Sequence, residues 1–284
     1  MREVGFDIAL GRVSALRNDG HGARVLALHG WLDNAASFVP LAARLRGLDL
    51  VALDLPGHGR SAHLPAGTEY GFSVALAAVL DVADALGWER FSLLGHSMGA
   101  GIASLLAAAC PERIERLVAI EMLGALAELP TRTAERMRDA VTAQRVVKDK
   151  RLRVFPDIGT AVRARLNASR VPGSGLDDVQ IRLLVERGVR AVPGGFVWSS
   201  DPRLTLPTLT RMTQAQIDDV LAAIDCPVLA VFADPAQPYL ADAERRRRVA
   251  LLPQGRLQTF PGGHHLHMQQ PDAVAAAIDA FVAR

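Results

Sequence analysis

Residues 91–109 read FSLLGHSMGAGIASLLAAA, and this stretch decides the fold of the chain. The apolar run at 91–94 is typical of a buried strand, and the small and apolar residues at 100–109 are typical of a helix. Between them, the glycines at 95 and 99 let the backbone turn sharply around Ser97. The stretch therefore predicts a strand, a tight turn with a serine at its tip, and a helix.

The pentapeptide GHSMG at 95–99 matches G-x-S-x-G, the pattern of a serine nucleophile on a strained strand-to-helix turn. Such a turn raises the Ser97 hydroxyl above the end of the strand. It also directs the Met98 N–H toward the charge that develops on a reacting carbonyl oxygen. Serine before a helix also serves as an N-cap. Because both flanks fit and partner residues occur elsewhere, we predict that Ser97 is a nucleophile.

Short apolar runs alternate with helix-like stretches along most of the chain. This alternation is typical of βαβ units, and it predicts an α/β fold with a mainly parallel sheet and helices on both faces. The strand-like runs lie at 24–30, 49–55, 90–97, 116–121, 226–233 and 256–260, and the helix-like stretches at 41–45, 73–86, 100–109, 241–252 and 272–284.

The pattern of strands stops between residues 125 and 225, which read as helical and are broken by VPGSG at 171–175 and VPGG at 192–195. A helical insert in a parallel sheet usually lies over the carboxyl ends of the strands, where ligands bind. We therefore predict a core made of residues 1–124 and 226–284, with a helical cap at 125–225. The four arginines at 245–248 fall in a predicted helix and are interpreted as a solvated face.

Composition narrows the class of protein. The chain has 284 residues, 50% hydrophobic and 22% charged, and a net charge of only +2, which gives no reason to expect a nucleic-acid partner. Its two cysteines, Cys110 and Cys226, each precede proline and form no metal-binding pattern. The N-terminal residues lack the apolar core of a signal peptide, and we see no run that would span a membrane. We expect a cytoplasmic protein.

A second loop, HGW at 29–31, follows the first predicted parallel strand. An oxyanion hole needs two fixed N–H donors from different loops, so we predict that Trp31 supplies the donor that complements Met98. His29 is interpreted as a structural histidine. In the loop DLPGHGRS at 54–61, Asp54 and His58 are expected to shape the turn rather than to catalyse.

Three histidines occur near the C-terminus in PGGHHLH at 261–267. Clustered histidines are also candidate metal ligands, but no carboxylate or cysteine is close in sequence and Ser97 needs a base. His264 follows the glycine pair directly, so we predict that it is the base and that no metal or cofactor is required. His265 and His267 are expected to pack the loop.

The acid that orients the base is harder to locate. The usual position follows the predicted strand at 226–233, where G-x-x-D is typical, but Ala233 and Ala236 occupy the pattern here. Asp234 fits only if the loop is one residue shorter. Glu121 ends the strand after the nucleophile helix, where an unpaired charge is costly. We favour Glu121 and keep Asp234 as the alternative.

With these residues in hand, the chain resembles the serine hydrolase-like (kraken-type) group of the α/β-hydrolase superfamily over nearly its whole length. The resemblance implies the α/β-hydrolase fold, hydrolase chemistry with Ser97 and His264, and a carboxylate at the position of Glu121; it implies no particular substrate. The matching strings are LALHGWLDNAASF at 26–38, ALDLPGHGRS at 52–61, LLGHSMG at 93–99, LVERG at 184–188, GFVWSSDPRL at 195–204 and PGGHHLHMQQP at 261–271.

We therefore expect a serine hydrolase that cleaves a small carboxylic ester or related acyl substrate. A cofactor-free C–C bond hydrolase uses the same residues and stays open, as does an inactive binding protein with this fold. A nucleophilic aspartate, as in dehalogenases and epoxide hydrolases of this fold, is excluded by Ser97. Candidate residues for the substrate pocket are Trp31, Phe38, Met122, Leu123 and Trp198, although Trp198 also fits a core position.

Overall fold

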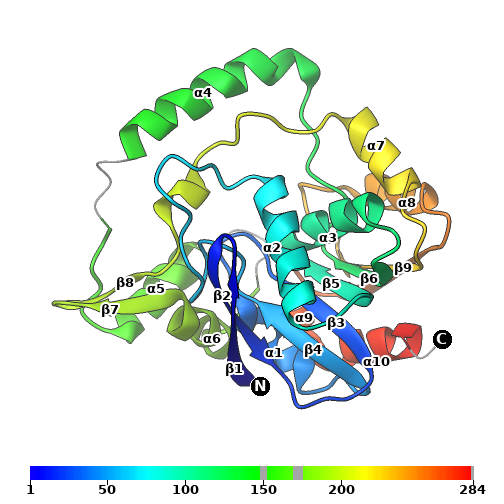
Figure 1. The fold of residues 1–284 in the computed structure, drawn as a ribbon, viewed down its shortest axis with the longest axis horizontal. Helices are drawn as coiled ribbons and strands as arrows, with labels where there is room; N and C mark the ends of the chain where they lie inside the picture. The colour runs from blue at the N-terminus through cyan, green and yellow to red at the C-terminus, as the bar shows by residue number, and fades with distance from the viewer. Residues whose placement is uncertain (148–151, 169–174, 283–284) are drawn as a thin grey trace.

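A computed structural model describes residues 1–147, 152–168 and 175–282 of the chain. Its central element is an eight-stranded sheet in the order β1-β2-β4-β3-β5-β6-β9-β10 (Figure 1). The six strands from β4 to β10 in this order run parallel. The predicted α/β fold with a mainly parallel sheet is confirmed.

Each predicted strand and helix of the core is present, with shifts of a few residues at the ends. The strands are β1 (Arg2–Ile8), β2 (Gly11–Arg17), β3 (Ala23–Leu28), β4 (Leu48–Leu53), β5 (Phe91–His96), β6 (Ile114–Ile120), β9 (Val228–Asp234) and β10 (Gly255–Pro261). The helices around them are α1 (Val39–Ala42), α2 (Phe72–Ala85), α3 (Met98–Ala109), α8 (Asp242–Ala250), α9 (Leu266–Gln269) and α10 (Pro271–Val282).

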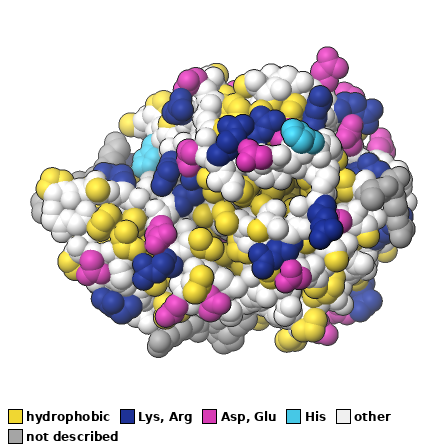
Figure 2. All heavy atoms as spheres, turned by 90° about the horizontal axis from the view of Figure 1, so that it is seen from below, with side chains coloured by type: hydrophobic (Ala, Val, Ile, Leu, Met, Phe, Trp, Pro, Cys, Tyr) yellow, Lys and Arg dark blue, Asp and Glu magenta, His cyan; other side chains and the backbone are white. Residues whose placement is uncertain are grey.

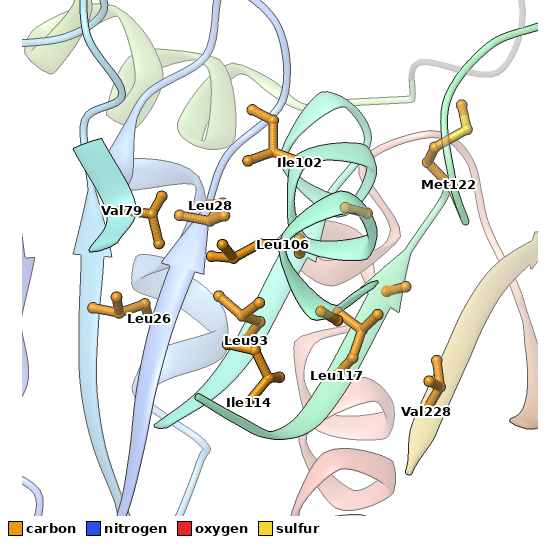
Figure 3. Packing of buried hydrophobic residues seen from close by; sticks show 14 of the residues in the cluster. Leu26, Leu28, Val79, Leu93, Ile102, Leu106, Ile114, Leu117, Met122 and Val228 are labelled. Carbon is orange, nitrogen blue, oxygen red and sulfur yellow. The ribbon is translucent and has the colours of Figure 1, made fainter. Parts of the chain in front are cut away.

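The core has two apolar layers, one on each face of the sheet. Successive side chains of a strand point to opposite faces, so Leu26 and Leu28 of β3 join one layer while Val25 and Ala27 join the other. The first layer includes residues of α2 and α3 (Figure 3), and the second includes residues of α1 and α10. Both faces of the inner parallel strands are therefore largely buried, as their continuous apolar sequence predicts, whereas β10 at the edge is half-exposed.

The first 17 residues form an antiparallel hairpin, β1–β2, that the sequence analysis did not anticipate. β2 pairs with β4 in antiparallel orientation and so extends the parallel sheet at one side. The hairpin residues are mostly exposed or half-buried, so they lack the continuous apolar run that marks the inner strands.

The segment between β6 and β9 adds no strand to the main sheet within the described residues. It contains η2 (Pro130–Arg132), α4 (Thr133–Val146), α5 (Ile158–Ala168), α6 (Asp178–Gly188), η4 (Pro202–Thr205) and α7 (Gln214–Ala222). A third apolar cluster joins α5 and α6 and includes Phe155 and Met268. Of the predicted break at 171–175, residues 171–174 lie outside the described residues.

The expectation that this segment is wholly helical is wrong. Two short strands, β7 (Val189–Val192) and β8 (Gly195–Trp198), form an antiparallel hairpin in which Val192 pairs with Gly195. The proline and glycine at 193–194, interpreted as a break between helices, form a two-residue hairpin turn instead, with Gly194 at φ +86°.

The interpretation of the arginine run at 245–248 as a solvated face is wrong for two of its members. Arg245 and Arg248 are only 1% and 2% exposed, whereas Arg246 and Arg247 lie at the surface. Positions three apart share a helix face, and this face of α8 points inward. The two buried guanidinium groups donate to backbone carbonyls, Arg245 to Leu240 and Ala233, and Arg248 to Leu123 and Ala125.

On the face drawn in Figure 2, basic and acidic side chains are interspersed among apolar ones rather than gathered by sign. Among the helices of the described residues, none combines the length and the apolar character needed to cross a membrane.

Candidate active site

Ser97 occupies a strained turn between β5 and α3. Its backbone angles are φ +52° and ψ −117°, a region that costs a non-glycine residue about 1–3 kcal/mol. A Cβ at residue 95 would lie 2.4 Å from Ala100 Cα, and one at residue 99 would lie 1.9 Å from the Leu28 carbonyl oxygen. Only glycine fits at both positions, which explains the G-x-S-x-G spacing physically.

A hydrogen bond ties the loop after β10 to this turn. His96 Nε2 lies 2.7 Å from the carbonyl oxygen of His264, and the two imidazole rings are 4.8 Å apart. His96 immediately precedes Ser97, so the predicted nucleophile and the predicted base lie at the same edge of the sheet. The His264 side chain is 26% exposed, which leaves part of its ring accessible from outside.

Glu121 lies at the end of β6, beside the same edge. It is fully buried, its φ is +58°, and Oε2 is 3.8 Å from His264 Nδ1. Its other oxygen, Oε1, accepts a hydrogen bond of 2.5 Å from the Ala233 N–H and lies 3.6 Å from Arg245 Nη2. The alternative acid, Asp234, is exposed at the end of β9.

Tyr239 stands between the two groups, and the sequence analysis missed it. Its hydroxyl oxygen is 2.6 Å from Glu121 Oε2 and 2.6 Å from His264 Nδ1. Burial and the Glu121 carboxylate raise the pKa of this hydroxyl above its usual value. The position of Tyr239 in the sequence could have indicated this role. It is one of only two tyrosines, and it lies in the loop after β9, where the acid of this fold is usually sought.

The loop after β3 lies beside the Ser97 turn because Leu28 pairs with Gly95. His29 has the structural role predicted for it: Nδ1 donates to Gly30 and Nε2 accepts from the Leu55 N–H. Burial lowers the pKa of His29 to about 4, so the ring is neutral near pH 7. The half-exposed Trp31 directs its indole N–H to the Leu204 carbonyl, 2.8 Å away.

Asp54 and His58 shape the loop after β4, as predicted. The buried Asp54 carboxylate accepts hydrogen bonds from the N–H groups of Ala35 and Arg60 and pairs with Arg187. Burial, and then the neighbouring His29, lower the pKa of His58 to about 3. Neither side chain contacts Ser97 or His264 in the described residues.

A buried polar cluster surrounds the other two histidines. Asp33, His96 and His265 have candidate metal-binding atoms within 4.8 Å of one another, and sequence spacing did not reveal this carboxylate. However, Asp33 Oδ2 already accepts from His265 Nε2 at 3.0 Å, and Oδ1 pairs with Arg165 at 2.6 Å. Both carboxylate oxygens are thus occupied by protein donors, so we interpret the cluster as an ion-pair network that anchors the loop of His264.

The residues predicted to line the substrate pocket differ in their exposure to solvent. Phe38 and Leu123 are fully buried in the core, and Met122 is 5% exposed. The prediction that Phe38 and Leu123 line a pocket is therefore not supported by the structure, because their side chains present no surface to a ligand. Trp198 is half-buried and packs edge-to-face on Phe155, with ring centroids 5.0 Å apart. Trp31 remains exposed.

The sequence profile of the alpha/beta hydrolase fold family matches residues 23–271. The chain belongs to this family. The α/β hydrolase described here is 32% identical to a serine hydrolase-like protein of Danio rerio over 272 residues, which cover 92% of this chain and 82% of the relative. It is 27% identical to the sn-1-specific diacylglycerol lipase of Mus musculus over 268 residues, covering 91% and 80%.

A solved structure is more similar still. The crystal structure of a hypothetical protein from Pseudomonas aeruginosa PAO1 shares 40% identity with this α/β hydrolase at a TM-score of 0.92, covering 100% of both chains. The recognised resemblance to the serine hydrolase-like group of α/β hydrolases is confirmed.

Proposed function

We propose that this α/β hydrolase is a serine hydrolase that cleaves a small carboxylic ester through Ser97, His264 and Glu121. The observation that carries the proposal is the strained conformation of Ser97 beside a loop whose histidine is linked to a buried carboxylate. A strained backbone at this position has no structural benefit of its own, and it suits a nucleophile. The similarity to a diacylglycerol lipase supports an ester as substrate.

In the proposed reaction, His264 Nε2 takes the proton of the Ser97 hydroxyl while the oxygen attacks the acyl carbon. The backbone N–H of Met98, at the start of α3, and the backbone N–H of Trp31 stabilise the oxyanion. The imidazolium then protonates the departing alcohol, and water, activated by the same ring, releases the acid from Ser97. The residues supply every proton transfer, and the steps use no cofactor.

We also propose that residues 125–225 act as a cap on this site. Three polar contacts support this proposal, and all of them reach the loop that carries Trp31. The contacts are Trp31 with the Leu204 carbonyl, Asn34 with the Leu184 carbonyl, and Asp33 with Arg165. A cap held to the oxyanion loop would exclude water from the acyl-enzyme.

A fluorophosphonate probe tests the proposal, because it reacts covalently with an activated serine. Wild-type protein should be labelled, Ser97→Ala should not, and Ser73→Ala, which alters an exposed serine of α2, should label like wild type. A series of p-nitrophenyl esters of increasing acyl length should then be hydrolysed. Labelling that survives Ser97→Ala would contradict the proposal, and labelling without ester turnover would favour C–C bond hydrolysis.

A further inference from the structure

We propose that Tyr239 is a positioning residue that couples Glu121 to His264, so that the acid acts through a phenol rather than by direct contact. This inference rests on the proposed function and adds a residue to it. The geometry points to it directly: the hydroxyl oxygen is 2.6 Å from both partners, whereas Glu121 Oε2 and His264 Nδ1 are 3.8 Å apart. A distance of 3.8 Å is too long for a hydrogen bond.

The donors and acceptors of the hydrogen bonds that join Glu121, Tyr239 and His264 can be assigned in one consistent way. The Glu121 carboxylate only accepts, so the single proton of the Tyr239 hydroxyl is donated to Oε2. The phenol oxygen then accepts the Nδ1–H of His264. This tautomer leaves the lone pair on Nε2, the nitrogen that must take the Ser97 proton.

Hydrogen-bond donors surround the Glu121 carboxylate, and Tyr239 is neutral. The Ala233 N–H and the nearby guanidinium of Arg245 stabilise the carboxylate on its Oε1 side. Arg245 is itself buried and held by the carbonyls of Leu240 and Ala233, so its charge stays in place. The raised pKa of the Tyr239 hydroxyl keeps its proton on the phenol. No proton needs to cross the phenol for the coupling to operate.

Hydrogen bonds to their backbones hold Glu121 and His264 in place at this separation. The Glu121 N–H donates to the Val231 carbonyl at 2.9 Å, and the His264 carbonyl accepts from His96 at 2.7 Å. These contacts resist the movement of about 1 Å that a direct hydrogen bond between Glu121 and His264 requires. The hydroxyl is therefore expected to be needed, not merely to fill space.

The coupling should appear in the protonation of His264. The titratable groups that contact its ring are Tyr239, Glu121, His96 and His265, and Glu121 is the carboxylate among them. A carboxylate linked by hydrogen bonds favours the imidazolium. Removing the linking hydroxyl should weaken the stabilisation of the imidazolium during attack.

The test is Tyr239→Phe, which keeps the ring and deletes the hydroxyl. We expect kcat on a p-nitrophenyl ester to fall by about 10–100-fold with KM nearly unchanged, and the acid limb of the kcat/KM profile to move about one pH unit lower. The matched control is Tyr70→Phe, which deletes a hydroxyl that donates to the Asp201 carboxylate at 2.8 Å, away from His264. Both variants lose a phenol–carboxylate hydrogen bond, but only Tyr239→Phe should change the pH profile.

A double variant separates coupling from simple packing. If Tyr239 transmits the effect of Glu121, then Tyr239→Phe combined with Glu121→Gln should lose no more kcat than the worse single variant. Losses that multiply, or a Tyr239→Phe enzyme with wild-type kcat and pH profile, would overturn the inference.

A readout without substrate distinguishes this failure from failure of the proposed function. Histidine NMR on the intact protein reports which ring nitrogen of His264 carries the proton, whether or not an ester is turned over. Loss of the Nδ1–H form in Tyr239→Phe supports the coupling, and an Nδ1–H signal unchanged from wild type refutes it. Absence of fluorophosphonate labelling in wild type would instead refute the proposed function alone.

Discussion

The guanidinium of Arg187, at the end of α6 in the inserted segment, lies 2.8 Å from the fully buried carboxylate of Asp54 in the loop after β4. Arg187 also pairs with Glu3 on β1 at 2.7 Å. One buried cation thus joins the insert to two separate parts of the core. The contact therefore holds α6 of the inserted segment against the loop after β4.

Removing that cation should destabilise the protein. Arg187→Ala leaves the Asp54 carboxylate buried without its ionic partner, and we expect unfolding free energy to fall by about 3 kcal/mol. The matched control is Arg182→Ala on the same helix, whose pair with Glu186 is half-exposed and should contribute less than about 0.5 kcal/mol. Urea denaturation measures both, and equal losses would show that the Asp54 contact adds nothing.

The strained turn should show a trade-off between stability and function. Ser97→Gly relieves the cost of φ +52°, so we expect it to be about 1 kcal/mol more stable than Ser97→Ala, which keeps the Cβ. Neither variant should react with a fluorophosphonate. Thermal or urea unfolding measures the difference, and variants of equal stability would indicate that the turn stores no strain.

Two conservative substitutions test which carboxylate orients His264. Glu121→Gln should reduce kcat by about 10²–10⁴-fold, because the charge that stabilises the imidazolium is lost. Asp234→Asn is the matched control and should change kcat little, since its side chain is exposed. Steady-state ester hydrolysis measures both, and the reverse result would reassign the acid to Asp234.

Buried histidines should make the fold sensitive to acid. Burial, and then the nearby His265, lower the pKa of His267 to about 3, whereas the unfolded state titrates at about 6.5. Between these two pH values, the His267 ring is protonated in the unfolded chain but neutral in the native protein. Unfolding free energy should therefore fall by about 1.4 kcal/mol per pH unit from this group as pH drops from about 6.5 toward 3.

The substitution His267→Phe tests that linkage. His267 already packs on Phe38 with ring centroids 5.3 Å apart, and neither of its nitrogens has a hydrogen-bond partner among the residues that the structure describes, so an apolar ring should fit. Urea unfolding at pH 6.5 and 5 should show a smaller loss of stability in the variant, by about 2 kcal/mol. Identical pH dependence in the two proteins would mean that His267 is protonated in the native state.

Local patterns were sufficient for much of the fold and of the site. The inner strands were found because burial on both faces demands continuous apolar runs. The Ser97 turn was found because glycines at 95 and 99 flank the serine in the local pattern G-x-S-x-G. These features depend on neighbours within a few residues.

Features that depend on distant partners were missed. The strands of the hairpins β1–β2 and β7–β8 are largely exposed or half-buried, so they carry no strong apolar pattern. The arginines at 245 and 248 resembled surface charges because their acceptors are carbonyls on other elements. Asp33 lies 232 residues from His265 in sequence, and only folding brings the pair together.

The sequence by itself determined the alternation of strands and helices, the serine on its tight turn and the glycine-flanked histidine, because each is encoded by residues that are adjacent along the chain. The tertiary structure alone decided which carboxylate approaches His264 and that a tyrosine hydroxyl stands between them. The reason is geometric: Glu121, Tyr239 and His264 come from three separate loops, and a hydrogen bond is set by ångströms between atoms rather than by spacing along the chain.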